Sequence, residues 1–304
     1  MRKSFISALI LVAVAAVAQN PPANQQPAPP SFQTNLTETA QAPSYSDLYC
    51  SGFITNEKPI LTNKVAAGVN SPDTTNYATG DYVYLSGSGF AEGARYSIVR
   101  ELRDPNHYEP FRGQRAAIAA LGQPFANIGR VRVVALRSGM AVAQVEFACQ
   151  NVTLGDIAVP FVEHEPVSYR KTLSVQRFPG SAGRLTARIV LTREFDTLVG
   201  TGHKVYIDAG STKGVKPGDY FRAVRGHAPA KIDPVDALSM NAPVGDDTQK
   251  NPGSNDRKTA AQLPVRTLGH LIVLTVTPTS STAMITDALE GIQVGDQVEL
   301  EGEE

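Results

Sequence analysis

The chain has 304 residues, 42% of them hydrophobic and 19% charged, with 28 Lys+Arg against 29 Asp+Glu. A formal net charge of -1 provides no excess positive charge to bind nucleic acid or anionic lipid, so neither is expected as a partner. The length suggests about two domains. A content of 25 Gly and 21 Pro with no Trp argues against a long helical bundle.

Residues 1–18 have the pattern of a secretory signal peptide. A cationic start at Arg2 and Lys3 precedes an apolar run, and Ala16 and Ala18 form a small-x-small cleavage site. A membrane-spanning helix is the alternative, but it needs about 20 apolar residues and this run has 14. We therefore expect an exported protein, periplasmic or extracellular, with no transmembrane anchor after cleavage. Because no cysteine closely follows the cleavage site, a lipoprotein is not expected.

The segment 19–47 is rich in Pro, Gln and Asn and contains few apolar side chains. Such a composition cannot offset the conformational entropy that is lost on ordering. We therefore predict a disordered linker that acts as a spacer, and recognition through its proline run is the less favoured alternative.

One unit occurs twice in the sequence. The matching blocks, in the same order, are 83–85 with 205–207, 89–100 with 214–225, and 128–159 with 268–299. We predict a first repeat over 48–161 and a second over 184–300, joined by a linker at 162–183. The second repeat carries a polar insertion at about 226–262 that we expect to be mobile.

Each repeat has the side-chain pattern of short strands. Apolar and polar residues alternate over 143–149, as in a half-buried strand, and 271–276 is a continuous apolar run suited to a central strand of a closed sheet. The one convincing helical segment is 112–121, bounded by Gly122. Many short strands with Gly-rich turns predict an all-β protein of two tandem small β-barrels, SH3-like or related.

The two cysteines, Cys50 and Cys149, are an even number in an oxidising compartment, which favours a disulfide between them. Two buried free thiols are the alternative. Repeat two has an apolar residue in place of Cys149 and, if 54–55 corresponds to 191–192, it has Ala187 in place of Cys50. Both cysteines are then missing together, as a bond between the first strand and a late strand of one barrel predicts.

Four Gly-Asp pairs stand just before apolar strands. They are 80–81, 155–156, 218–219 and 295–296. Glycine permits a positive φ and the Asp carboxylate accepts backbone N–H groups, so we predict four structural turns. A calcium site is the alternative, but it needs several oxygen ligands within one loop, and these pairs are isolated.

The sequence predicts no catalytic residue, no cofactor site and no metal site. Its five histidines are His107, His164, His203, His227 and His270. No two of them stand at the i, i+4 spacing of a metalloprotease helix, so we expect solvated surface side chains rather than a zinc site. Ser88 lacks the Gly-x-Ser-x-Gly context of a nucleophile turn, and a bridged or core-facing Cys149 is not a nucleophile.

Cationic and aromatic residues of repeat one form a candidate partner-binding face. Its members are Arg95, Arg100, Arg103, Tyr108 and Arg112. The face would accept an anionic envelope polymer or a partner protein, and the alternative is a solvated surface balanced by nearby carboxylates. Because Arg100 and Arg225 end the same strand of the two repeats, a shared structural role is favoured for that pair.

Several turn and strand motifs follow one another in a distinctive order. They are Tyr-x-x-Gly-Asp-Tyr-Val-Tyr-Leu at 77–85, Gly93, Tyr-Ser-Ile-Val-Arg at 96–100, Ile-Gly at 128–129 and Leu-Gly-Asp at 154–156. This order resembles the paired β modules that follow a LysM peptidoglycan-binding module in a family of bacterial envelope proteins. The segment 214–221, Gly-Val-x-Pro-Gly-Asp-x-Phe, is distantly similar to the C-terminal domain of flagellar assembly protein T.

The resemblance implies an exported, non-catalytic envelope protein. It covers 49–300, and the segment 19–46 is too short and too rich in proline to be a LysM module. Peptidoglycan binding is therefore not carried over, and no functional residue is transferred.

Our leading hypothesis from the sequence is an exported structural or adaptor protein of the bacterial cell envelope, with an envelope protein or a cell-wall polymer as its partner. The first alternative is an envelope polysaccharide or peptidoglycan hydrolase with a site between the modules and the 226–262 insertion as a lid. The second alternative is an assembly factor for a surface appendage.

Overall fold

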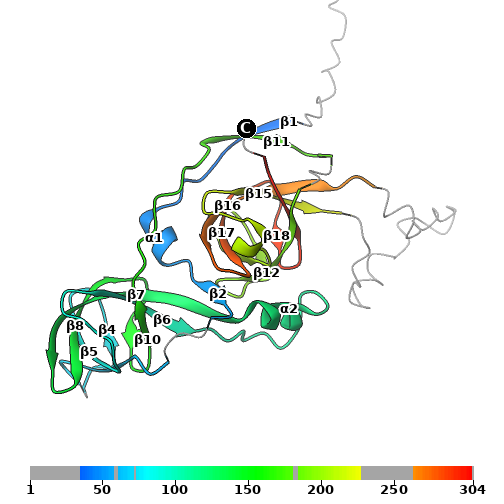
Figure 1. Cartoon of the computed structure of the whole chain (residues 1–304). Helices are drawn as coiled ribbons and strands as arrows, with labels where there is room; N and C mark the ends of the chain where they lie inside the picture. Colours follow the sequence, from blue (N-terminus) through cyan, green and yellow to red (C-terminus); the bar gives the residue numbers. More distant parts are fainter. Residues whose placement is uncertain (1–34, 58–60, 72, 181–183, 227–262, 303–304) are drawn as a thin grey trace, which may run out of the picture. The chain divides into compact units, whose positions relative to one another are not determined.

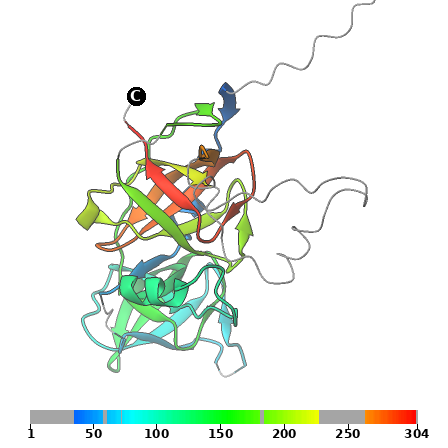
Figure 2. The same cartoon turned by 90° about the vertical axis from the view of Figure 1, so that its right-hand side faces the viewer.

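Short antiparallel strands form most of the regular structure, and they build two closed barrels of six strands each. The computed structural model describes residues 35–57, 61–71, 73–180, 184–226 and 263–302 (Figure 1). The predicted signal peptide, the predicted linker up to residue 34 and the insertion from 227 to 262 lie outside the described residues. Figure 2 separates the barrels by colour, cyan to green for barrel one and yellow-green to red for barrel two.

Barrel one closes because β7 pairs with both β6 and β8. Its strands, in order around the barrel, are β3 (Lys64–Gly68), β5 (Tyr82–Ser86), β8 (Met140–Ala148), β7 (Gln123–Arg137), β6 (Arg95–Glu101) and β10 (Ile157–Pro160). Three shorter strands accompany them: β4 (Asn76–Tyr77) pairs with β9 (Val152–Thr153), and β2 (Phe53–Thr55) pairs with the start of β7.

Barrel two repeats this strand order element by element. Its strands are β12 (Thr186–Thr192), β14 (Lys204–Ile207), β17 (Ser281–Ala288), β16 (Arg266–Val276), β15 (Tyr220–Arg225) and β19 (Gln297–Leu300). The pair β13 (Leu198–Val199) with β18 (Ile292–Gln293) corresponds to β4 with β9. A short 3-10 turn, η1, covers Ser211–Lys213. The predicted duplication of a small β-barrel is therefore confirmed.

Each barrel has its own apolar core, built from the inward side of the alternating strands. In barrel one the core includes Ile98, Ile128 and Val131, and in barrel two it includes Phe221 and Leu271, all fully buried. Burial of one such side chain contributes about 1.5–3 kcal/mol relative to its exposure to water. The period-two patterns thus supply the main stabilisation of both barrels.

The predicted helix over 112–121 is confirmed as α2 (Gln114–Leu121), which ends at Gly122 as expected. A third apolar cluster joins this helix to barrel two, because Leu121 and Ile54 pack with Val190 and Tyr206. The side-chain amide of Gln114 donates a hydrogen bond to the Val190 carbonyl at 2.9 Å. The helix therefore helps to hold the barrels together.

The prediction of disorder is wrong for the last part of the segment 19–47. Strand β1 (Asn35–Thr39) pairs with β11 (Thr172–Gln176), a strand within the predicted linker, and α1 (Tyr45–Tyr49) follows. Local composition could not reveal β1, because its partner strand is distant in sequence. The ordering entropy is offset by tertiary contacts, since the neighbouring Ala40 packs with Leu173 and Val175 against barrel two.

The start of α1 is fixed by a capping box. The Ser44 hydroxyl accepts the Asp47 N–H at 3.2 Å, and the Asp47 carboxylate accepts the Ser44 N–H at 2.8 Å. Asp47 also pairs with Lys204 of barrel two. Burial raises the pKa of Asp47, but the hydrogen bonds from Lys204 and Ser44 outweigh this and lower it below its usual value.

The disulfide between Cys50 and Cys149 is confirmed, with a Cα–Cα distance of 5.6 Å. The alignment of 54–55 with 191–192 is wrong, because β12 takes the place in barrel two that β3 takes in barrel one. Cys50 instead caps the end of α1, before the additional strand β2, and Cys149 follows β8. The bond therefore joins the segment that enters barrel one to the end of a barrel strand.

The segment 50–55, which we call the seam segment, is shared by the two barrels. Tyr206 of barrel two donates its hydroxyl to the Ser51 carbonyl at 3.2 Å, and the Thr282 hydroxyl donates to the Gly52 carbonyl at 2.8 Å. Further along, the Ile54 carbonyl accepts the Ser280 hydroxyl at 2.8 Å. These contacts satisfy backbone carbonyls that would otherwise be buried without partners.

Replacement of Gly52 by alanine is expected to lower the free energy of unfolding by about 3 kcal/mol. Gly52 has φ +74°, and a Cβ there would lie 2.4 Å from the Tyr206 hydroxyl and 2.7 Å from the Phe125 carbonyl. Gly89→Ala is the matched control, since Gly89 has φ +79° with no atom near its Cβ position. The control should lose only about 1 kcal/mol. If denaturant titrations gave the same loss of unfolding free energy for Gly52→Ala and Gly89→Ala, the close packing around Gly52 would not contribute to stability.

Candidate binding surface

The four Gly-Asp pairs form the predicted structural turns. Each glycine has a positive φ, between +87° and +105°. Each Asp carboxylate accepts the N–H of the residue three positions before it, at 2.7–2.8 Å. The geometry is the same in both barrels.

Arg100 and Arg225 have the shared structural role that their positions indicate. The Arg100 Nε donates to Asp156 at 2.7 Å, and Arg225 Nη2 donates to Asp296 at 2.6 Å. Each arginine thus ties the end of β6 or β15 to the second Gly-Asp turn of its barrel. The hydrogen bond that Arg100 donates to Asp156 raises the pKa of Arg100, and the one that Arg225 donates to Asp296 raises the pKa of Arg225.

The predicted partner-binding residues divide among three places. Arg100 serves the turn just described, and Arg95 on β6 pairs with Glu146 on β8. Arg103, Tyr108 and Arg112 are exposed and lie in the loop between β6 and α2. That loop docks on barrel two, since the Asn106 amide donates to the Phe195 carbonyl at 3.0 Å and Phe111 packs beneath Arg188.

Arg95 belongs instead to a group of three arginines around one carboxylate. Arg95, Arg130 and Arg132 all pair with Glu146, at 3.1, 3.1 and 2.5 Å. We call these four residues the arginine face. Partial burial raises the pKa of Glu146, but the hydrogen bond from Arg132 and the charges of all three arginines outweigh it and lower this pKa. Three cations and one anion leave two uncompensated positive charges here.

Aromatic side chains border the arginine face on the side of α1. Arg130 donates to the Tyr45 hydroxyl at 2.7 Å, and its guanidinium lies 5.0 Å from the centre of the Phe161 ring. The Tyr45 ring also meets Phe147 edge-on, with 5.5 Å between centroids. These contacts hold Arg130 in place, while the Arg95 and Arg132 side chains stay 41% and 43% exposed. The latter two are therefore available to a partner.

The arginine face continues into an apolar surface on β5 and β7. Tyr82, Gln144, Arg132 and Arg95 stand opposite one another across four neighbouring strands, so they form one row. Tyr82 is 42% exposed, and Val134, two residues after Arg132, is 45% exposed. The surface thus offers both positive charge and apolar contact.

Arg130, Arg132 and Glu146 were missing from the predicted face. The strand pattern contained the necessary signal, because both arginines alternate with valines and Glu146 alternates with Val145 and Phe147. The cross-strand register that brings them to Arg95 is a long-range property, which a single sequence does not display.

The expectation of a solvated surface is wrong for His270. This side chain is 2% exposed, and it lies between Asp287, 3.0 Å from Nδ1, and Glu301, 3.4 Å from Nε2. Burial lowers its pKa, but the hydrogen bonds to the two carboxylates outweigh this and raise it to about 9. Hence His270 is a buried cation, part of a structural ion-pair network.

The other histidines differ in exposure. His107 and His203 are exposed, as predicted, and His164 is half-buried, so that burial lowers its pKa. His227 lies outside the described residues.

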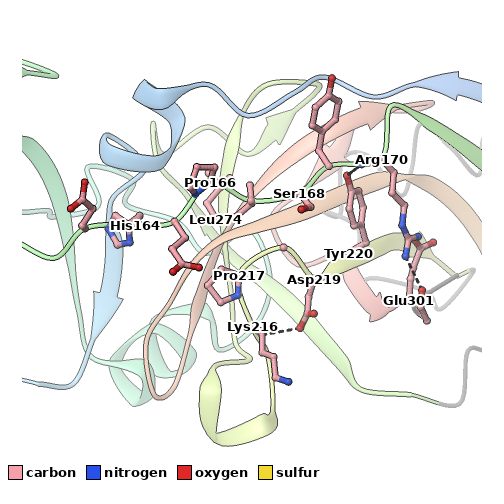
Figure 3. Close-up of a pocket in the computed structure, with 16 residues that line it drawn as sticks. His164, Pro166, Ser168, Arg170, Lys216, Pro217, Asp219, Tyr220, Leu274 and Glu301 are labelled. Carbon is pink, nitrogen blue, oxygen red and sulfur yellow. Dashed lines mark hydrogen bonds and ion pairs between the residues drawn. The ribbon is translucent and has the colours of Figure 1, made fainter.

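A groove of about 710 Å³ runs between the linker residues 163–170 and the turn 216–220 of barrel two (Figure 3). Three of its polar side chains have partners within the protein. The Arg170 side chain pairs with Glu301 at 3.5 Å, and the backbone N–H of Arg170 donates to the Tyr220 hydroxyl at 2.6 Å. The Asp219 carboxylate accepts the backbone N–H of Lys216 in its own turn. Arg170, Tyr220 and Asp219 are therefore engaged in holding the linker and the turn in place.

Across the described residues, no group of three or more His, Cys, Asp or Glu side chains is placed to hold a metal ion. No helix in this part of the chain has the length and apolar character needed to span a membrane. No protein-family model matches the chain, and no curated protein is significantly similar to it.

Proposed function

We propose that the protein is an exported, non-catalytic adaptor of the bacterial cell envelope, whose partner binds the arginine face and the adjoining surface of barrel one. The observation that supports this most is the pair of uncompensated arginine charges in a chain whose formal net charge is -1. Charge complementarity of this kind guides association and selects partners. The seam segment and α2 join the two barrels, so barrel two is attached to the barrel that carries this surface.

The pocket between the barrels gives no support to the hydrolase alternative. It has about 530 Å³, and Glu57 is the one carboxylate among its described lining residues. Glycoside hydrolysis ordinarily uses a pair of carboxylates. Two of the polar side chains at the wall are already bonded, Asn63 to Ser88 at 3.0 Å and Tyr96 to the Gly89 carbonyl at 3.1 Å.

In-cell crosslinking tests the proposal. A photo-crosslinking amino acid at Val134 is expected to capture a discrete envelope component. The Arg95→Ala/Arg132→Ala variant should reduce that capture about tenfold, because two charge-assisted contacts are lost. Arg103→Ala/Arg112→Ala removes the same charge from the exposed loop and should leave the capture unchanged. A crosslinker at Leu198, 58% exposed on barrel two, is the positional control.

Two outcomes would contradict the proposal. The first is equal capture from positions 134 and 198, or capture that does not depend on Arg95 and Arg132. The second is release of soluble muropeptides when the purified protein is incubated with cell walls, since that would show catalysis. Cosedimentation with the walls but without such release agrees with the adaptor role.

A further inference from the structure

The two barrels allow a comparison of the same face in two settings. Arg95, Arg132 and Val134 of barrel one correspond to Tyr220, Ile272 and Leu274 of barrel two, as the repeat alignment and the strand order show. Even the irregularities match, because the register of β7 with β8 shifts between Val133 and Ala135, and that of β16 with β17 between Val273 and Thr275. The two faces therefore share one backbone surface.

In barrel two this surface is a docking site for an extended segment of the same chain. Leu173 and Val175 of β11 form one apolar cluster with Tyr220, Ile272 and Leu274. The edge of the segment is fixed by Thr267, whose N–H donates to the Arg177 carbonyl at 2.9 Å. As a result Tyr220, Ile272 and Leu274 are 5%, 0% and 1% exposed.

In barrel one the same surface is open among the described residues. The Arg95 and Arg132 side chains are 41% and 43% exposed, and Val134 is 45% exposed. Its chemistry also differs, since two of the three docking positions carry arginine. A segment that covered it would need acidic side chains opposite these arginines and apolar side chains opposite Val134 and Tyr82.

We infer that the open face of barrel one binds an extended, acidic segment of a partner protein, seated as β11 is seated on barrel two. The inference rests on the proposed adaptor function, and it specifies the chemical character of the partner that the adaptor binds. A strand presents side chains alternately to its two sides, so only every second residue would face barrel one, and these residues must include both Glu and Val or Leu to meet the arginines and the apolar positions. A cell-wall polyanion would satisfy the arginines but would leave Val134 and Tyr82 without apolar contacts.

Peptide binding to the full mature chain tests this. The probe is a fluorescein-labelled peptide of about six residues, a typical strand length, in which every second residue is in turn Glu and Val, with Thr between them, so that one side of the strand carries both acidic and apolar side chains. A peptide of the same composition in blocked order and a polyglutamate of the same length are the comparisons. Fluorescence anisotropy should give a Kd for the matched peptide at least tenfold below that of either comparison.

Two variants locate the site. Arg132→Glu should weaken binding of the matched peptide at least tenfold, and Val134→Asp should do the same by removing the apolar contact. Arg103→Glu and Leu198→Asp make the same changes at exposed positions elsewhere and should leave Kd unchanged. Circular dichroism of all four variants is the control for folding, and each is expected to give the wild-type spectrum.

Equal affinity for the matched peptide and polyglutamate, absence of peptide binding, or insensitivity to Val134→Asp would each overturn the inference. If these results came together with arginine-dependent capture of a cell-wall polymer at position 134, the adaptor function would stand and only the peptide inference would fall. If position 134 captured nothing in cells either, both would fall.

Discussion

The free energy of unfolding of the Cys50→Ser/Cys149→Ser variant is expected to be about 4 kcal/mol lower than that of the oxidised wild type. The disulfide closes a loop between residues 99 positions apart, and the chain-entropy model assigns about 4–5 kcal/mol to a loop of this length. The bond also ties Cys50, the first residue of the seam segment, to the end of β8, so we expect its loss to loosen that segment. Denaturant titration at constant pH measures the difference.

Reduction supplies the control for the disulfide. Wild type treated with a reducing agent should match the serine variant, and the same agent should leave the serine variant unchanged. If the reduced and oxidised wild type unfolded at the same denaturant concentration, the bond would carry no stability. A single variant is less informative, because it leaves a reactive thiol.

The protein is expected to lose stability on the order of 3 kcal/mol as the pH rises from 6.5 through 9, because of His270. The pKa of this histidine is about 9 in the folded chain, against a usual 6.5. A raised histidine pKa contributes stability that is fully present below 6.5 and disappears as the pH rises through 9. Above that, Asp287 and Glu301 face a neutral ring in a buried site. Denaturant titrations over this range measure the loss.

His270→Gln should lack this pH step and should be less stable than wild type at pH 6, since it leaves the buried Asp287 carboxylate without its cation and removes one of the two cations beside Glu301. His203→Gln is the matched control, because His203 is exposed and its loss should preserve the step. The pKa of Tyr220 is raised by burial above its usual 10, so this tyrosine does not titrate in the window. A wild-type stability that stays flat from pH 6.5 to 9.5 would contradict the assignment of a charged His270.

Local patterns were sufficient for most of the fold. Alternation over 143–149, the blocks that recur and the Gly-Asp pairs can all be read from short stretches of sequence, and these predicted the barrels and the turns. Helix α2 was also recognisable, since its alanines and Gly122 are local signals. In these cases the local preference and the tertiary structure agree.

Features that depend on distant partners were missed. Strand β1 is ordered by β11, and α1 by its contacts with both barrels. His270 was expected on the solvated surface, because its two carboxylate partners come from β17 and from the segment that follows β19. The arginine face required the register of three strands, so only Arg95 was identified in advance.

The pairing of β1 with β11 has a mechanical consequence. The two strands are antiparallel, with Asn35 opposite Gln176 and Thr39 opposite Thr172. The Gln176 carbonyl accepts the Thr267 hydroxyl at 2.6 Å, so barrel two holds β11 at the end that lies opposite the start of β1. Tension applied ahead of Asn35 would therefore peel the two strands apart rung by rung instead of shearing all rungs at once. This clasp would give way at low force, while the covalent bridge from Cys50 to Cys149 would carry the tension past the residues between them, so that these could not be drawn out.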